Sequence, residues 1–471
     1  MFICLGIGSE SLDWSRILHA GFRPASLVTE FMNNPRRAVY NAQLFCVVVR
    51  HQENIVDPGI PVRQPRWGIL ALLFVISAVT YMDRVNISVT ARQMMPAYGL
   101  TDQDMGYIFS AFVLGYALCQ IPGGWLGDRW GARAILATAL VWWSFFTAFT
   151  ALAATLPLAA AVGTVGALVV VRFLLGVGEA VALPNFNRAV ADWIPPAQRG
   201  LGIGIAIGGI GVGAAITPPL ASWVMVNYHW QTVFYLSALV GIVVALFWVV
   251  CSRDGQEAGG GSRGQRSHPR LAIPWSKFAR SSSLRWLVLS YACLGYVAYI
   301  YMSWFYLYLV NVRGIDLLRG GWLAAAPFVA ILVFCPLGGW TTDRLVALVG
   351  LTRARMIVGM IGMAFASGLI ALGAWVDSQS VAITCLSLGA GWLYFTVGAY
   401  WSVTTDLSKT HAGTLSGVMN MGANAGGVIS PSLTPWLADH WGWTASLLVA
   451  ALIACCGGAM WVFINPEESL E

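Results

Sequence analysis

Apolar segments of about 20 residues recur along the chain from Trp67 to Ile464. A helix needs about this length to cross the roughly 30 Å hydrocarbon core of a bilayer. With 58% hydrophobic and only 10% charged residues, the composition argues against a soluble multidomain protein. We therefore predict an all-α membrane protein with twelve transmembrane helices. The predicted spans are 67–90, 104–126, 133–155, 160–186, 200–226, 231–251, 285–310, 320–340, 354–376, 380–405, 412–436 and 442–464.

The basic residues between these spans are distributed unevenly. From Arg63 onward, 17 Lys and Arg residues fall in segments that lie on one side if the spans alternate in direction. Only Arg92, Arg313 and Arg319 fall on the other side. Cytoplasmic loops carry the excess of positive charge in membrane proteins, so both termini are expected in the cytoplasm. The net charge of +6 is explained by this asymmetry, and no nucleic-acid partner is expected.

Two sequence patterns occur twice, which indicates an internal repeat. The motif at 123–129 returns at 338–344, which is 215 positions later. At an offset of 213, spans five and eleven share eight residues in register. These are Gly200, Gly204, Gly209, Gly213, Ile216, Pro218, Leu220 and Trp230, matched by Gly413, Gly417, Gly422, Gly426, Ile429, Pro431, Leu433 and Trp443. The chain is therefore expected to form two six-helix bundles related by pseudo-two-fold symmetry.

The domain boundaries follow from the repeat and from one polar stretch. Residues 252–284 contain three consecutive glycines and six basic residues, which predicts a flexible cytoplasmic linker. The bundles then occupy 63–251 and 285–464, followed by a cytoplasmic tail at 465–471. Residues 1–62 are expected to form a disordered cytoplasmic extension.

Span five presents a row of glycines on one helix face. Gly200, Gly204, Gly208 and Gly211 follow one another at helical spacing, which leaves this face without side chains. Small residues allow close helix approach in lipid. The face could serve packing inside one bundle or sliding between the two bundles.

Four charged residues lie deep inside predicted spans: Asp83, Arg84, Arg172 and Glu179. Each ionised side chain at the centre of a membrane helix costs about 2.5–3.5 kcal/mol. Such residues usually mark a pathway for ions or charged substrates. A static ion-pair network that holds neighbouring helices together is the alternative.

The spacing of these residues limits how they can pair. Asp83 and Arg84 are adjacent and point about 100° apart on a helix, so each needs another partner. We expect Arg84 to face a cavity and Asp83 a neighbouring helix. Arg172 and Glu179 are seven residues apart, or roughly 10 Å along the axis, which is too far for a direct bond between backbone-aligned positions. Burial favours the protonated form of a carboxylate and a nearby cation favours the ionised form, so these carboxylates could carry protons.

The loop after the second span carries the pattern Gly124-x-x-x-Asp128-Arg129-x-Gly131-x-Arg133. It resembles the loop signature of the major facilitator superfamily, and a degenerate copy with Asp343 and Arg344 follows the eighth span. The resemblance implies the major facilitator fold. It also implies that Gly124, Asp128, Arg129, Arg133, Asp343 and Arg344 form a cytoplasmic gate.

Spans one and four narrow the resemblance. Tyr81-Met82-Asp83-Arg84 and the segment from Arg172 to Glu179 are similar to the anion:cation symporter branch, which includes permeases for hexuronates, glucarate and galactonate. The similarity runs from Arg66 to Ile464. It implies that Arg84 binds the substrate carboxylate, with Tyr81 in contact with the substrate. Asp83 and Glu179 would carry protons, and Arg172 would set the charge state of Glu179.

Polar residues in other spans could line the same cavity. Span two contributes Tyr116 and Gln120, and the second half contributes Tyr301, Thr405, Asn420 and Asn424. Amides and hydroxyls of this kind suit a polyhydroxy acid. For the tyrosines, an aromatic belt at the bilayer interface is the alternative.

These features predict proton-coupled symport of a small organic anion in a bacterial inner membrane, by a chain expected to be monomeric. An exporter or antiporter of an organic anion or drug on the same fold remains the alternative. A membrane enzyme is disfavoured because no HExxH pattern occurs, and the single GxSxG match, at 260–264, lies in the linker without a preceding strand. No cofactor or metal is expected.

Overall fold

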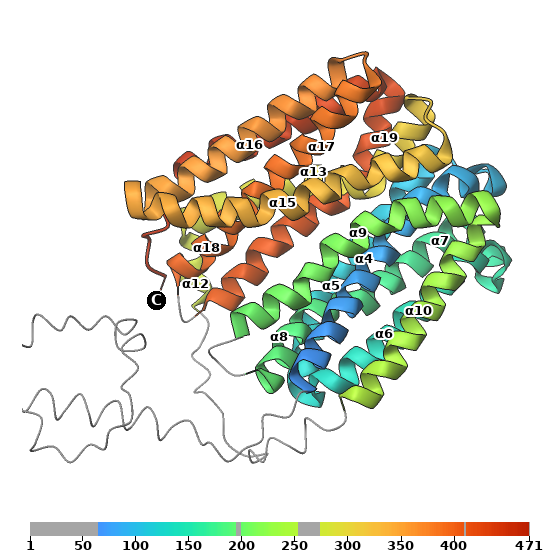
Figure 1. Cartoon of the computed structure of the whole chain (residues 1–471), viewed down its shortest axis with the longest axis horizontal. Helices are drawn as coiled ribbons and strands as arrows, with labels where there is room; N and C mark the ends of the chain where they lie inside the picture. The colour runs from blue at the N-terminus through green and yellow to red at the C-terminus, as the bar shows by residue number, and fades with distance from the viewer. Residues whose placement is uncertain (1–64, 195–198, 253–273, 409–410, 471) are drawn as a thin grey trace, which may run out of the picture. The chain divides into compact units, whose positions relative to one another are not determined.

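The computed structural model describes residues 65–194, 199–252, 274–408 and 411–470, and these are almost entirely helical. The predicted extension at 1–62 and most of the predicted linker lie outside these residues. Figure 1 shows the blue-to-green helices gathered in one bundle and the yellow-to-red helices in another. The first bundle contains α4 (Pro65–Tyr98), α5 (Asp102–Trp130), α6 (Ala132–Leu152), α7 (Pro157–Ala180), α8 (Ala182–Trp193), α9 (Arg199–Asn227) and α10 (Trp230–Cys251), with η1 (Ala153–Thr155) after α6. After the short α12 (Trp275–Arg280), the second contains α13 (Ser282–Ser303), α14 (Phe305–Leu307), η3 (Tyr308–Val312), α15 (Leu317–Val349), α16 (Leu351–Trp375), α17 (Gln379–Phe395), α18 (Val397–Leu407), α19 (Ala412–Ala459) and η4 (Met460–Phe463).

The last helix, α19, contains the final two predicted spans. Its 48 residues would extend about 72 Å if straight, more than twice the thickness of a bilayer core. Gly442 breaks it with φ of 84°, a conformation that glycine adopts without strain. The Ser446 hydroxyl donates to the Thr434 carbonyl oxygen at 3.0 Å, so the chain doubles back between these residues. Helix α19 therefore accounts for two crossings. Ten other long apolar segments, each made of one helix or of two successive helices, account for one crossing each, so the described residues provide the predicted twelve.

The predicted repeat is visible in how the helices pack. A Cβ added to Gly209 or Gly213 of α9 would lie 2.0–2.1 Å from a carbonyl oxygen of α4. In the second bundle, a Cβ on Gly422 or Gly426 of α19 would lie 2.6 or 2.1 Å from a carbonyl oxygen of α13. Only glycine permits these approaches. The matched glycines therefore fix equivalent helix pairs in the two halves.

Three predicted spans differ from the continuous helices expected. Span four is interrupted at Val181 between α7 and α8, and span ten at Thr396 between α17 and α18. These two breaks are 215 positions apart, the offset of the repeated loop motif. Span seven breaks at Trp304, whose indole nitrogen donates to the Pro431 carbonyl oxygen at 3.0 Å. Discontinuous helices of this kind surround the binding sites of many transporters.

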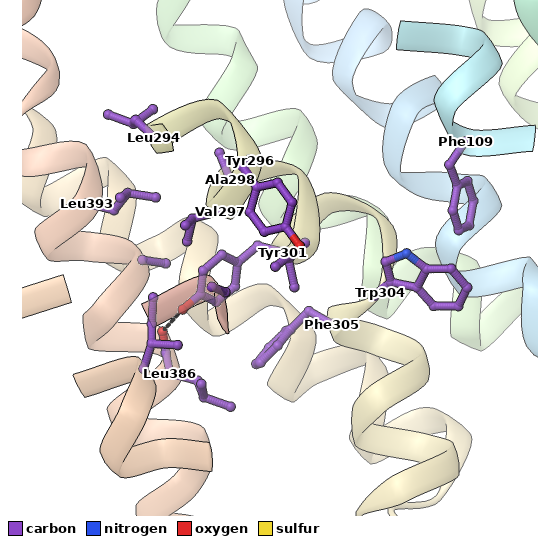
Figure 2. Close-up of a cluster of buried hydrophobic side chains, with 14 of the residues drawn as sticks. Phe109, Leu294, Tyr296, Val297, Ala298, Tyr301, Trp304, Phe305, Leu386 and Leu393 are labelled. Carbon is purple, nitrogen blue, oxygen red and sulfur yellow. Dashed lines mark hydrogen bonds between the residues drawn. The ribbon is translucent and has the colours of Figure 1, made fainter. Parts of the chain in front are cut away.

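The two bundles meet at the ends of the helices expected to face outward. The Ser110 and Ser432 hydroxyls lie 2.8 Å apart across the interface, and Gln103 donates to the Ser432 carbonyl oxygen at 3.2 Å. Phe109 of the first bundle lies edge-on against Trp304 of the second, with ring centroids 5.4 Å apart (Figure 2). These contacts join the two bundles at this end.

Toward the ends expected to face the cytoplasm, three glycines have no close neighbour. A Cβ on Gly204, Gly413 or Gly417 would meet no heavy atom within 4 Å, whereas one on Gly211 would meet Leu332 of α15. The glycine row of span five therefore contributes to the contact between bundles at Gly211, while packing against α4 uses Gly209 and Gly213.

Candidate functional site

The site is built around an ion pair between α4 and α7. The Nε atom of Arg84 lies 2.9 Å from Oε2 of Glu179, and the two side chains are 5% and 0% exposed. One further donor of the arginine, Nη2, and the second carboxylate oxygen, Oε1 of Glu179, are buried without a hydrogen-bond partner. The family resemblance implied that Arg172 sets the charge state of Glu179; in the structure the ion-pair partner of this carboxylate is Arg84. The Arg84 guanidinium is thus only partly used: Nε is paired with Glu179, whereas Nη2 makes no hydrogen bond.

Aromatic rings surround the Arg84 guanidinium. Its Cζ atom lies 4.2 Å from the ring centroid of Tyr116, 4.8 Å from that of Tyr81 and 5.3 Å from that of Phe112. Arg172 lies 4.9 Å from the same Phe112 ring, which therefore contacts both cations. Cations are stabilised over aromatic faces, most strongly where water is excluded. Phe112 was not among the predicted site residues, because a phenylalanine in an apolar helix carries no sequence signal of its own.

Asp83 has other side-chain partners than Arg84, although both residues contact α7. Its Oδ1 atom accepts a hydrogen bond from Asn86 Nδ2 at 3.3 Å, and its backbone oxygen accepts one from Arg172 Nη1 at 3.5 Å. The Thr147 side chain of α6 also faces this carboxylate. The two adjacent charges of α4 therefore point to different surroundings, as helix geometry requires.

Close packing of α5 on α7 fixes the helix that carries Glu179. A Cβ on Gly115 would lie 2.2 Å from the Phe173 carbonyl oxygen, and one on Gly176 would lie 2.1 Å from that of Phe112. Helix α7 ends at Ala180, directly after Glu179. Backbone contact at the glycines therefore fixes α7 against α5, with Glu179 one residue before the end of its helix.

A chain of polar side chains links the pair to the second bundle. Gln120 Nε2 donates to the Tyr116 hydroxyl at 3.2 Å, and Gln120 Oε1 accepts from Asn420 at 3.3 Å and from Asn424 at 3.5 Å. The structure thus brings together four predicted residues from two spans, one in each bundle.

Two other predicted residues lie elsewhere. The Tyr301 hydroxyl donates to the Leu386 carbonyl oxygen at 2.7 Å, inside the second bundle (Figure 2). Thr405 is exposed on the last turns of α18. Instead, Tyr299 of α13 lies within electrostatic range of Arg84 and Glu179. A helical periodicity places Tyr299 and Tyr301 on different faces, but the sequence does not say which face meets the first bundle.

The described gate residues make contacts within their own bundle. Arg133 donates to the Val249 carbonyl oxygen at 2.9 Å. Asp343 is 81% exposed and lies 3.9 Å from Arg355, which pairs more closely with Asp406 at 3.0 Å. Arg129 and Arg344 lie over the neighbouring rings of Trp125 and Trp340, and a Cβ on Gly124 would touch Pro184. The side chain of Asp128 is outside the described set. Arg355 was missed because the second loop copy is degenerate and the basic residue is shifted.

Comparisons with known proteins agree with this architecture. A family model described as Major Facilitator Superfamily matches residues 73–431 and 402–471. The chain is 32% identical over 419 residues to a probable sulfoacetate transporter of Cupriavidus necator, covering 86% of this chain and 94% of that protein. It is 28% identical over 407 residues to a hexuronate transporter of Bacillus subtilis, covering 84% of this chain and 94% of that protein. These relatives are transporters rather than enzymes.

One solved structure shares the fold. It is a bacterial homologue of the human lysosomal transporter Spinster in an inward-facing, unoccupied conformation. The TM-score is 0.73 at 19% identity, and the match covers 87% of this chain and all of that one (100%).

Proposed function

Because the chain belongs to the major facilitator superfamily, we propose that it is a secondary active transporter that carries a small organic anion together with protons. The relatives named above are a probable sulfoacetate transporter and a hexuronate transporter, and both of these substrates are organic anions. We also propose that the protein is a monomer in a bacterial inner membrane, as its bacterial relatives suggest for the location. The basic residues of its loops support a cytoplasmic position for both termini.

The observation that carries the proposal is the partly used guanidinium of Arg84. Its Nε atom is paired with Glu179, while Nη2 is buried without a partner. A buried unpaired donor costs about 1–3 kcal/mol, so a ligand oxygen at this position would be stabilising. Guanidinium groups bind carboxylates with paired hydrogen bonds. A substrate carboxylate at Arg84 would therefore compete with Glu179 for the same donors.

Charge balance links anion binding to cation uptake. Asp83, Arg84, Arg172 and Glu179 are buried, with exposed fractions of 1%, 8%, 2% and 0%, and their formal charges sum to zero. An added monoanion leaves one uncompensated negative charge in a region of low dielectric, which is costly. Protonation of Glu179 restores neutrality and frees Arg84 for the substrate. We therefore assign proton coupling to Glu179 and Asp83, at one cation per anionic charge.

The opposite end of the site suits hydroxyl groups or a second acidic group. Gln120, Asn420 and Asn424 offer amide donors and acceptors, and Tyr116 and Tyr299 offer hydroxyls. Sugar acids such as hexuronates, glucarate or galactonate carry groups of both kinds. In the proposed cycle the two bundles rock about this site, and the loops around Asp128 and Asp343 close the cytoplasmic side.

Substrate binding can be tested with purified full-length protein and a panel of organic acids, including hexuronates, galactonate, glucarate and sulfoacetate. We expect at least one acid to raise the melting temperature, and Arg84→Lys and Arg84→Ala to abolish that rise. Arg92→Gln is the matched control, because it removes an exposed arginine from the outer end of the same helix. If both Arg84 variants still respond to the acid, Arg84 is not the anion site.

Coupling can be tested in proteoliposomes loaded with or without an inward proton gradient. Wild-type protein should concentrate the anion only with the gradient. Glu179→Gln should still exchange labelled for unlabelled anion but should not concentrate it. Accumulation by this variant would contradict the coupling role. An exporter or antiporter would instead accumulate anion when the gradient is reversed.

A further inference from the structure

A buried asparagine lies at the break between α7 and α8. Asn185 is 1% exposed, and its Nδ2 atom donates to the Val181 carbonyl oxygen at 2.7 Å. The regular helical bond to the same oxygen, from the Asn185 backbone N–H, is long at 3.4 Å. A side chain that bonds the carbonyl oxygen four residues earlier competes with the helical hydrogen bond and bends the helix. The Asn185 amide is therefore part of the break at Val181.

The same amide joins the break to the repeated loop motif at 123–129. Nδ2 of Asn185 also donates to the Gly123 carbonyl oxygen of α5 at 3.2 Å. A Cβ added to Gly127 would lie 1.8 Å from Asn185 Oδ1, and one added to Gly123 would lie 2.8 Å from the Cα atom of Val181. Gly123 and Gly127 are four residues apart on α5, and Val181 and Asn185 are four residues apart across the break. The two missing side chains let this face of the motif pack directly on the break.

The internal repeat shows which part of this contact is general packing. At the offset of 215, Gly123 corresponds to Gly338 and Val181 to Thr396. A Cβ on Gly338 would lie 1.8 Å from the Phe395 carbonyl oxygen. The second bundle therefore also packs its motif glycine on its own helix break, which lies at Thr396.

The amide link itself is not repeated. At the same offset Asn185 corresponds to Tyr400, whose hydroxyl hydrogen-bonds with Ser290 of α13 rather than with the loop motif. Glu179 corresponds to Tyr394. The half that contains the ion-pair carboxylate is thus the half in which an amide ties the helix break to the motif.

Glu179 lies two residues before this break. The Val181 backbone N–H donates to the Glu179 carbonyl oxygen, so a shift of the last turn of α7 reaches Val181 directly. We propose that Asn185 is a positioning residue of the transport cycle, which couples Glu179 to the loop motif at 123–129. When Arg84 is released from Glu179, the Asn185 amide makes the break and the end of α5 shift together. The inference rests on the proposed function for the role of Glu179, and it adds the residue that links this carboxylate to the gate loop.

Hydrogen–deuterium exchange of the purified full-length protein tests this coupling without any organic anion. Glu179→Gln imitates the protonated carboxylate. We expect it to change the exchange rates of residues 123–130 by at least about threefold in the wild-type background, and by less than about 1.5-fold when Asn185→Ala is also present. Asn185→Asp keeps the shape of the side chain but removes both amide hydrogen bonds, so it should give the same loss of coupling.

Asn227→Ala is the matched control. The Asn227 side chain also donates to the carbonyl oxygen four residues earlier, that of Trp223, at 2.8 Å, but it makes no described hydrogen bond to a second helix. In this background the effect of Glu179→Gln on residues 123–130 should persist.

Transport rate and affinity give a second test. In proteoliposomes, Asn185→Ala should lower the maximal rate of anion transport about tenfold and leave the dissociation constant of the anion within about twofold of the wild-type value. This split is expected because Asn185 contacts the break and the motif and makes no described hydrogen bond with Arg84. A loss of affinity without a loss of rate would contradict the positioning role.

An unchanged loop motif in Glu179→Gln alone would overturn the proposal whether or not the Asn185 variants fold. An effect of Glu179→Gln that persists in both Asn185 variants, or that disappears equally in Asn227→Ala, would overturn it as well. Proton-driven anion uptake by a protein that shows no such coupling would refute the role of Asn185 and leave the proposed function standing. Coupling through Asn185 in a protein that carries no organic anion would do the reverse.

Discussion

The competition between Glu179 and the substrate for Arg84 predicts that one substitution strengthens anion binding. Glu179→Gln keeps the shape of the side chain but removes its charge. The wild-type pair is 2.9 Å apart, with side chains 5% and 0% exposed. Removing one partner of such a buried pair typically costs about 3–5 kcal/mol, because the other charge is left uncompensated.

A ligand carboxylate that approaches Arg84 recovers part of this cost. If it recovers only about 1.4 kcal/mol, the dissociation constant of the anion falls about tenfold. The variant alone should therefore melt at a lower temperature than the wild type, and a saturating anion should raise its melting temperature more. Equilibrium binding of a labelled anion to the purified variant gives the affinity directly.

Asp83→Asn is the control for this prediction. It removes a carboxylate from the same buried group, but one whose described hydrogen bond is with Asn86 rather than with Arg84. It should not tighten anion binding to a comparable degree. Weaker or unchanged anion binding by Glu179→Gln would refute the competition between the carboxylate and the substrate.

Three further predictions concern packing and gating. Gly213→Ala should destabilise the protein by about 1–3 kcal/mol through overpacking, because its Cβ would lie 2.1 Å from the Ala78 carbonyl oxygen. Thermal melting should show no such loss for Gly204→Ala on the same helix, because no atom lies within 4 Å of the added Cβ there. A disulfide between cysteines introduced at Ser110 and Ser432, whose hydroxyls are 2.8 Å apart, should stop transport until it is reduced. Failure to cross-link in membranes would contradict the contact between the two bundles at these residues. Asp406→Asn should lower the melting temperature, because Asp406 pairs at 3.0 Å with the Arg355 side chain, which is only 8% exposed. Loss of the exposed Asp343 carboxylate should lower the free energy of unfolding by less than about 1 kcal/mol. Equal losses would show that the two carboxylates are equivalent partners of Arg355.

Much of the architecture could be predicted from the chain alone. Apolar length and charge asymmetry depend on residue type and order, so the twelve crossings followed directly. The repeated glycines also follow from the sequence, because a missing side chain permits close backbone approach wherever the helix packs. Their matched contacts with α4 and α13 confirm the repeat.

Pairing between distant helices was decided by the tertiary structure. The four buried charges were evident in the sequence, but the partner of Glu179 is Arg84, which is 95 positions away. Sequence spacing describes neighbours on one helix and carries no information on how two helices are rotated toward each other. The same limit explains why Tyr299 rather than Tyr301 lies near Arg84, and why Phe112 was missed. Residue type determined which charges the membrane must accommodate, and helix rotation determined which of them meet.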